Sequence, residues 1–266
     1  MFFFLYSALA WEPRLVNGNS ATWKSDSVSF FLNTDRMTEL SEEEIEEAVR
    51  SAAEAWNSNS ENASFSFEYQ GVSKNTGADF SDGEHIVSFD NSWTQDPSLL
   101  AVTHVWTTSD GTIQHFDIEV NIDDINWTTS AEMGKHDLQN SMTHEFGHAL
   151  GLEHSDDSEA TMAANTAIGE TQKRDLGADD ILGLNSLYTA SNQEENPSKP
   201  SGTEEGSNSS GGGVTNSTIE GPSSSGSGNG PVALEKAGCS SSGSLPLALF
   251  FWAAICVVST RQLSLS

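Results

Sequence analysis

The chain has 266 residues, of which 11 are basic and 39 acidic, giving a formal net charge of −28. A charge this negative argues against nucleic acids and anionic membranes as partners. Its two cysteines, Cys239 and Cys256, both lie past residue 190, so the first 190 residues hold neither a disulfide nor a thiolate metal ligand. The length suits one substantial domain with appendages, and we expect a monomer.

Residues 1–10 (MFFFLYSALA) are apolar and end in Ala8-Leu9-Ala10, which is similar to a secretory cleavage site. We predict a secretory signal peptide whose true start is missing, because the apolar run is short and no basic residue precedes it. A buried N-terminal strand is the alternative. An exported chain without disulfides in its main part fits a bacterium better than an animal.

Residues 11–190 carry the patterns of one α+β domain, with strands mostly first and helices last. Ser41 and Glu44 form a capping box, after which apolar residues recur at helical spacing, so a helix is expected there. The predicted helices are 42–57, 137–152 and 179–188. The predicted strands are 27–33, 64–70, 85–90, 100–107 and 113–121, the last two joined by a hairpin turn.

The second predicted helix contains the residues best suited to chemistry. His144 and His148 are four residues apart, so they lie on one helix face about a turn apart, as two ligands of one metal ion must. Gly151 can adopt a left-handed conformation and turn the chain, so that His154 supplies a third nitrogen. Three histidines leave one position of a tetrahedral zinc open, which is typical of catalytic sites. Glu145 is placed to act on a metal-bound water rather than to bind the metal. The alternative is histidines that only cap or pack.

Two further segments follow the domain. Residues 191–238 are rich in Ser, Gly, Asn, Glu and Pro, and we predict a flexible linker. Residues 239–266 hold an apolar run over 245–258, which at fourteen residues is short for a bilayer span. The pattern from Gly238-Cys239 onward is similar to bacterial C-terminal sorting signals, while a tail anchor or a lipid-anchor signal stays open. We therefore predict a protein that is secreted or anchored at the cell surface, with this segment attaching it.

The sequence of residues 144–155 (HEFGHALGLEHS) resembles the zinc-binding motif of the metzincin peptidases. Ser155 after the third histidine is as in the matrixins, the matrix metalloprotease-like branch. Ala164 agrees, because astacin and serralysin relatives carry a tyrosine there. The resemblance covers about residues 11–190. It implies that Met162, in a sequence similar to the family's methionine turn, lies beneath the zinc and that Asp180 holds the backbone of this turn.

The resemblance also implies a fold and an activity. The fold is a twisted sheet of five strands, four parallel and one antiparallel, with helices packed against it. A peptide substrate would add as another strand to the edge strand 100–107, beginning Leu100, Ala101, Val102, Thr103, His104. The implied activity is that of a zinc endopeptidase acting on extracellular proteins. In it, Glu145 takes a proton from a zinc-bound water and passes it to the departing amine.

Two features of the matrixin pattern are incomplete. Animal matrixins bind a second, structural zinc through three histidines and an aspartate. His104 and His115 stand at two of these positions and are expected to face each other across the hairpin, but the loop 91–98 has no histidine for the remaining pair. Val120 replaces the usual calcium carboxylate three residues past Asp117, so Ca²⁺ has no clear ligands.

Three functions are compatible with the motif. The first is the zinc endopeptidase. The second is a zinc-bearing binding or adhesion module without turnover, against which Glu145 argues because a structural site gains nothing from that carboxylate. The third is hydrolysis of a non-peptide amide, against which the strand-forming edge argues because it favours extended peptides. No cysteine precedes the domain, so latency through a thiol on zinc is not expected.

Overall fold

The computed structural model describes residues 10–60, 63–189, 233–237 and 240–242. Most predicted elements are confirmed within two residues at either end, and the ligand helix is shorter at its C-terminal end. The helices are α1 (Glu42–Asn57), α2 (Leu138–Ala149), α3 (Ala178–Tyr188) and the 3-10 turn η1 (Gln172–Arg174). The main strands are β3 (Ser27–Asn33), β4 (Ser66–Val72), β5 (Ile86–Asp90), β6 (Ala101–Thr107) and β7 (Ile113–Asn121).

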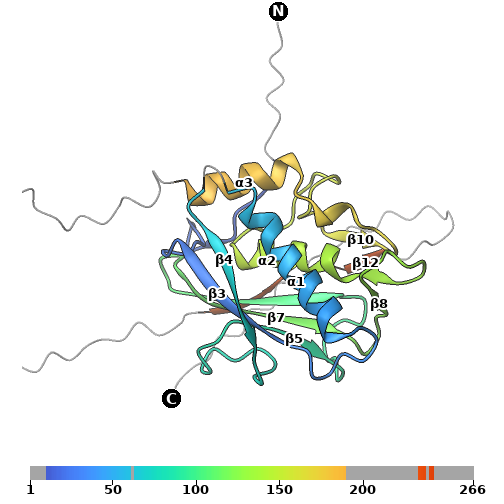
Figure 1. Cartoon of the computed structure of the whole chain (residues 1–266). Helices are drawn as coiled ribbons and strands as arrows, with labels where there is room; N and C mark the ends of the chain where they lie inside the picture. The colour runs from blue at the N-terminus through green and yellow to red at the C-terminus, as the bar shows by residue number, and fades with distance from the viewer. Residues whose placement is uncertain (1–9, 61–62, 190–232, 238–239, 243–266) are drawn as a thin grey trace, which may run out of the picture.

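One mixed sheet organises the molecule, and α1 and α2 lie together on one of its faces (Figure 1). Its strand order is β11-β6-β7-β5-β3-β4. The strands β4, β3, β5 and β7 are mutually parallel and β6 runs antiparallel to β7, which confirms the five-stranded arrangement and the α+β class. The sixth strand, β11 (Ala233–Ala237), is an addition on the outer side of β6 that was not predicted.

Several short strands complete the structure. A hairpin and a parallel pair lie outside the main sheet, and a third pair joins the region after the metal motif to the C-terminal part of the chain. These pairs are β1 (Leu15–Val16) with β2 (Asn19–Ser20), β8 (Trp127–Thr128) with β9 (His136–Asp137), and β10 (Asn165–Ala167) with β12 (Ser240–Ser242).

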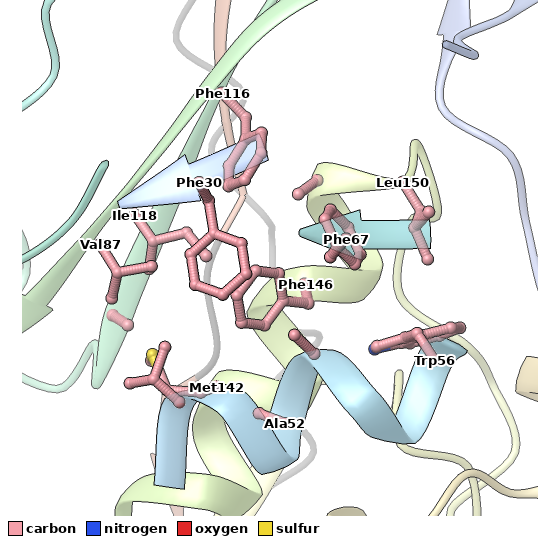
Figure 2. Close-up of a cluster of buried hydrophobic side chains, with 14 of the residues drawn as sticks. Phe30, Ala52, Trp56, Phe67, Val87, Phe116, Ile118, Met142, Phe146 and Leu150 are labelled. Atoms are coloured by element: carbon pink, nitrogen blue, oxygen red, sulfur yellow. The ribbon is translucent and has the colours of Figure 1, made fainter. Parts of the chain in front are cut away.

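A cluster of aromatic rings packs α2 against the sheet (Figure 2). Phe146 of α2 lies 5.1 Å from Phe30 of β3 and 4.8 Å from Phe67 of β4, measured between ring centroids. All three rings are buried, as is Phe116 of β7. Burying each such side chain contributes roughly 1.5–3 kcal/mol to stability. The face of α2 that carries Phe146 therefore fixes the helix against the sheet.

The C-terminal end of α2 is held by side chains from distant segments. The last carbonyls of a helix have no partner within it. Here the indole N–H of Trp23 donates to Ala149 O at 2.9 Å, and the hydroxyl of Tyr188, at the end of α3, donates to Leu150 O at 2.6 Å. Burial raises the pKa of Tyr188, so its phenol stays protonated and able to donate. These bonds fix the helix end next to the metal motif.

Some predicted segments lie outside the described residues. These are residues 1–9 of the predicted signal peptide, most of the predicted linker, and the apolar run 245–258. Ala233–Ala237 fall within the range predicted as linker and form β11 instead. In the part of the chain that the structure describes, no helix has the length and apolar character needed to cross a membrane.

Candidate metal centre

The three predicted histidine ligands come together at the end of α2. His144 and His148 lie on the helix and His154 follows it, and each offers a ring nitrogen within 4.8 Å of the other two. The Nε2 atoms of His144 and His148 are 3.1 Å apart. Among the described residues, this is the one cluster of three or more such side chains that could hold a metal ion.

Hydrogen bonds orient two of these rings as metal ligands. His144 Nδ1 lies 2.7 Å from Thr161 O, and His148 Nδ1 lies 2.8 Å from Leu152 O. A carbonyl oxygen only accepts, so each Nδ1 carries the proton and each neutral ring keeps a lone pair at Nε2. Burial, assisted by neighbouring positive charges, lowers the pKa of both histidines well below the usual value and keeps them neutral.

This arrangement fits a zinc ion. With both Nδ1 atoms donating, the short approach of the His144 and His148 Nε2 atoms brings two lone pairs together rather than forming a hydrogen bond. A cation between them turns this repulsion into attraction. Neutral imidazole nitrogens are ordinary zinc ligands, and a second hydrogen bond at Nδ1 is the usual way in which proteins fix the orientation of such a ring.

The turn after α2 positions the third histidine. Gly151 has φ +94°, which confirms the predicted left-handed residue. An added Cβ would lie 2.2 Å from the backbone oxygen of Ala21, so only glycine fits. The same turn presents Leu152 O to His148 Nδ1. One tight turn therefore directs the chain toward His154 and orients His148.

Met162 packs against Gly147 of the ligand helix, and its position beneath a zinc ion stays a prediction. A Cβ built on Gly147 would lie 2.3 Å from Met162 Sδ and 2.8 Å from Trp56 Cζ2. Gly147 thus leaves the space that the methionine fills. Because Thr161 holds His144 through its carbonyl, the turn that carries Met162 also supports a ligand.

Asp180 holds the methionine turn in place, which confirms its expected role. Its carboxylate accepts from Thr161 N at 2.7 Å and from Met162 N at 2.9 Å. It also accepts from Gly177 N at 2.8 Å, at the start of α3, so the role of an N-terminal helix acid applies as well. Burial raises the pKa of Asp180, while the three N–H donors act in the opposite direction.

Changing Asp180 to asparagine should loosen the turn. An amide NH₂ in place of one carboxylate oxygen leaves at least one buried backbone N–H without an acceptor, which costs about 1–3 kcal/mol of unfolding free energy. A urea titration should show a lower midpoint with an unchanged slope. Glu47→Gln, which removes one negative charge from the exposed face of α1, is the matched control. Equal midpoints for the two variants would contradict this role.

Glu145 lies beside the ligands and is completely buried. Thr103 of β6 donates its hydroxyl to Glu145 Oε2 at 2.6 Å. The sequence placed Thr103 only on the substrate edge strand, and no local pattern predicts this contact, because the two residues are 42 positions apart. The structure therefore connects the predicted proton-transfer group to the predicted substrate strand.

The weak second-metal candidates are arranged differently from the prediction. The β6–β7 ladder pairs His104 with Asp117 and His115 with Trp106, so the two histidines do not face each other. His104 Nε2 lies 2.6 Å from Glu119 Oε2, and His115 Nε2 lies 3.1 Å from Asp117 Oδ2. Each is paired with a carboxylate, and the His85 ring lies 4.7 Å from that of His115, measured between centroids. A second zinc at this place stays a prediction.

Comparisons with known proteins agree with the motif. The matrixin family model matches residues 22–189. Human neutrophil collagenase is 34% identical over 165 residues, which cover 61% of this chain and 32% of that protein. Metalloendoproteinase 1-MMP of Arabidopsis thaliana is 28% identical over 167 residues, which cover 62% of this chain and 44% of that protein. Human matrilysin is 39% identical over 74 residues, covering 28% and 26% of the respective chains.

The chain thus spans about a quarter to less than half of the length of these relatives. The matched region begins before β3, contains the three histidines and the methionine turn, and ends just after α3. Because the family model covers well over half of the sequence, the chain belongs to the matrixin family.

Proposed function

We propose that the protein is a zinc-dependent endopeptidase that hydrolyses peptide bonds of extracellular proteins. The observation that carries this proposal is the convergence of three histidine nitrogens on and just after the helix that also holds the buried Glu145. The relatives named collagenase, matrilysin and metalloendoproteinase support it. The net charge of −28 argues against nucleic acids as partners.

His144, His148 and His154 would hold the zinc ion. When bound, zinc supplies Lewis-acid chemistry, polarising a carbonyl group and acidifying water. Glu145 has the position of the general base: it accepts a proton from the water that attacks the peptide carbonyl. It then delivers this proton to the departing amine. The Thr103 hydroxyl holds the carboxylate while it does so.

The substrate would be an extended peptide. The side of β6 away from β7 offers main-chain groups that pair with β11 in the structure, and a substrate peptide would form its main-chain hydrogen bonds with the same groups. Thr103 lies in β6 and contacts Glu145, so a peptide on this strand passes beside the proton-transfer group. Strand addition of this kind favours a peptide over a small amide.

The setting of the domain is also part of the proposal. A signal segment at 1–10, a catalytic domain at 11–190, a linker at 191–238 and an attachment segment at 239–266 together describe a secreted or surface-anchored peptidase. The apolar composition of the first and last segments supports this plan. A binding module without turnover would use the same segments, so activity decides between the two.

Zinc removal tests the proposal. The purified chain should contain about one zinc ion, and a chelator should abolish digestion of casein or gelatin until zinc, but not calcium, is restored. At a free zinc concentration 1,000 times the dissociation constant, bound zinc should stabilise the fold by about 4 kcal/mol, which differential scanning calorimetry detects. A zinc-loaded chain that cleaves no protein would favour a binding module. Cleavage of small amides alone would favour the non-peptide activity.

A further inference from the structure

The substrate strand β6 already has a partner on its outer side. Residues Ala233–Ala237 form β11 and pair with β6 in an antiparallel ladder that runs from Ala233 opposite Thr107 to Ala237 opposite Thr103. Residues 190–232 separate β11 from the end of the catalytic domain in the sequence. The C-terminal part of the chain thus pairs with the side of β6 to which a substrate peptide would add.

A second pairing joins the tail of the chain to the segment that follows Met162. Ser240–Ser242 form β12, which pairs in parallel with β10 (Asn165–Ala167), and both strands are labelled in Figure 1. The strand β10 begins three residues after Met162, so it continues the methionine turn. The strand β12 therefore pairs with the segment that directly follows the methionine turn.

The two contacts lie next to catalytic and ligand-supporting groups. Thr103, which pairs with Ala237, donates its hydroxyl to Glu145. Asn165, which pairs with Ser240, follows the turn whose Thr161 carbonyl holds His144. Ala237 and Ser240 are only three positions apart in the sequence, so one short stretch of chain supplies the partners of both β6 and β10.

We propose that residues 233–237 and 240–242, here called the tail segment, bind in cis along β6 and β10 and compete with substrate for β6. This proposal rests on the proposed peptidase function. An uncovered sheet edge presents unpaired N–H and C=O groups that favour another strand. A segment joined covalently to the domain has an effective concentration of about 1 mM at its binding strand, so even weak strand pairing covers β6 part of the time. Substrate must then displace the chain's own tail.

Proline substitution in β11 tests the proposal, because it should weaken the pairing of the tail segment with β6. Alternate residues of an antiparallel strand direct their N–H groups to one neighbour, so two consecutive prolines remove at least one ladder donor. The variant Leu234→Pro/Glu235→Pro should lower KM for an external peptide by about two- to tenfold with kcat unchanged, as expected when a tethered competitor is lost. Ser223→Pro/Ser224→Pro, in the predicted linker, is the matched control and should leave KM unchanged.

Hydrogen exchange of the full chain supplies a readout that needs no turnover. Backbone amides of residues 233–237 and of β6 should exchange faster in the β11 variant than in the parent chain and the linker control. If no form cleaves peptides while this difference persists, the peptidase function fails and the cis contact stands. Equal exchange and equal KM in all three forms would overturn the contact.

Two further outcomes would overturn the cis competitor. Relief of inhibition on dilution of the parent chain would show that the tail of one copy binds another. Hydrolysis of the parent chain between Ala237 and Ser240, as fast as that of an external peptide and abolished by Glu145→Ala, would show that the segment is consumed as a substrate. Mass spectrometry of the intact chain over time distinguishes this second outcome. Inhibition that is independent of concentration, with an intact tail, supports the proposal.

Discussion

Replacing Glu145 with alanine should lower kcat for peptide hydrolysis by about 10²–10⁴-fold while the zinc content stays unchanged, the range expected for loss of a general base. Glu145 is buried beside the ligands and is not one of the three clustered metal-binding residues, so its loss removes proton transfer and spares metal binding. The measurement is turnover of a fluorogenic peptide, paired with the zinc content of the same sample.

The control must separate the lost proton transfer from a lost carboxylate elsewhere. Glu47→Ala removes an exposed acid from α1 and should retain full activity. Glu145→Gln keeps the shape of the side chain and an oxygen that can accept from Thr103, yet it cannot take a proton from water. It should therefore be as inactive as the alanine variant. Undiminished turnover by either Glu145 variant would refute the assigned role.

Local patterns account for most of what the sequence predicted correctly. The helix α1 begins and ends where its capping box and apolar spacing placed it, and the Ser41–Glu44 bonds are present in both directions. Likewise, the spacing of His144 and His148 on one helix face needs no distant contact. A left-handed glycine then suffices to place His154. These predictions succeed because the residues involved lie within one or two helical turns of each other, where the backbone geometry alone determines their relative positions.

The features that were not predicted from the sequence depend on strand pairing between residues far apart in the chain. The β6–β7 ladder changes register between Trp106 and Thr107, and such an irregularity sets which residues face each other. Without this shift the pairing of Thr107 with Ile113 would place His104 opposite Phe116, and with it His104 pairs with Asp117. The strand β11 has no composition that marks it as a strand, because its ladder depends on the free side of β6. Contacts of this kind form only when the whole sheet assembles, so no local sequence pattern predicts them.

The largest loss of stability is expected for Gly151→Ala. Alanine in the left-handed region costs roughly 1–2 kcal/mol by itself. At this position the added Cβ would also lie 2.2 Å from the backbone oxygen of Ala21, and a backbone atom cannot move aside as a flexible side chain can. We expect a total loss of about 3–5 kcal/mol in unfolding free energy, in the range of severe substitutions. Urea unfolding of the metal-free chain measures it.

Gly134→Ala separates the two causes of this loss. Gly134 has φ +85°, close to the +94° of Gly151, but an added Cβ there meets nothing within 4 Å. It should therefore show only the conformational cost of about 1–2 kcal/mol. The two variants should also differ in zinc affinity, because only the turn at Gly151 presents Leu152 O to His148 and leads to His154. Equal stability and equal zinc affinity in both variants would mean that the Ala21 contact does not constrain the turn.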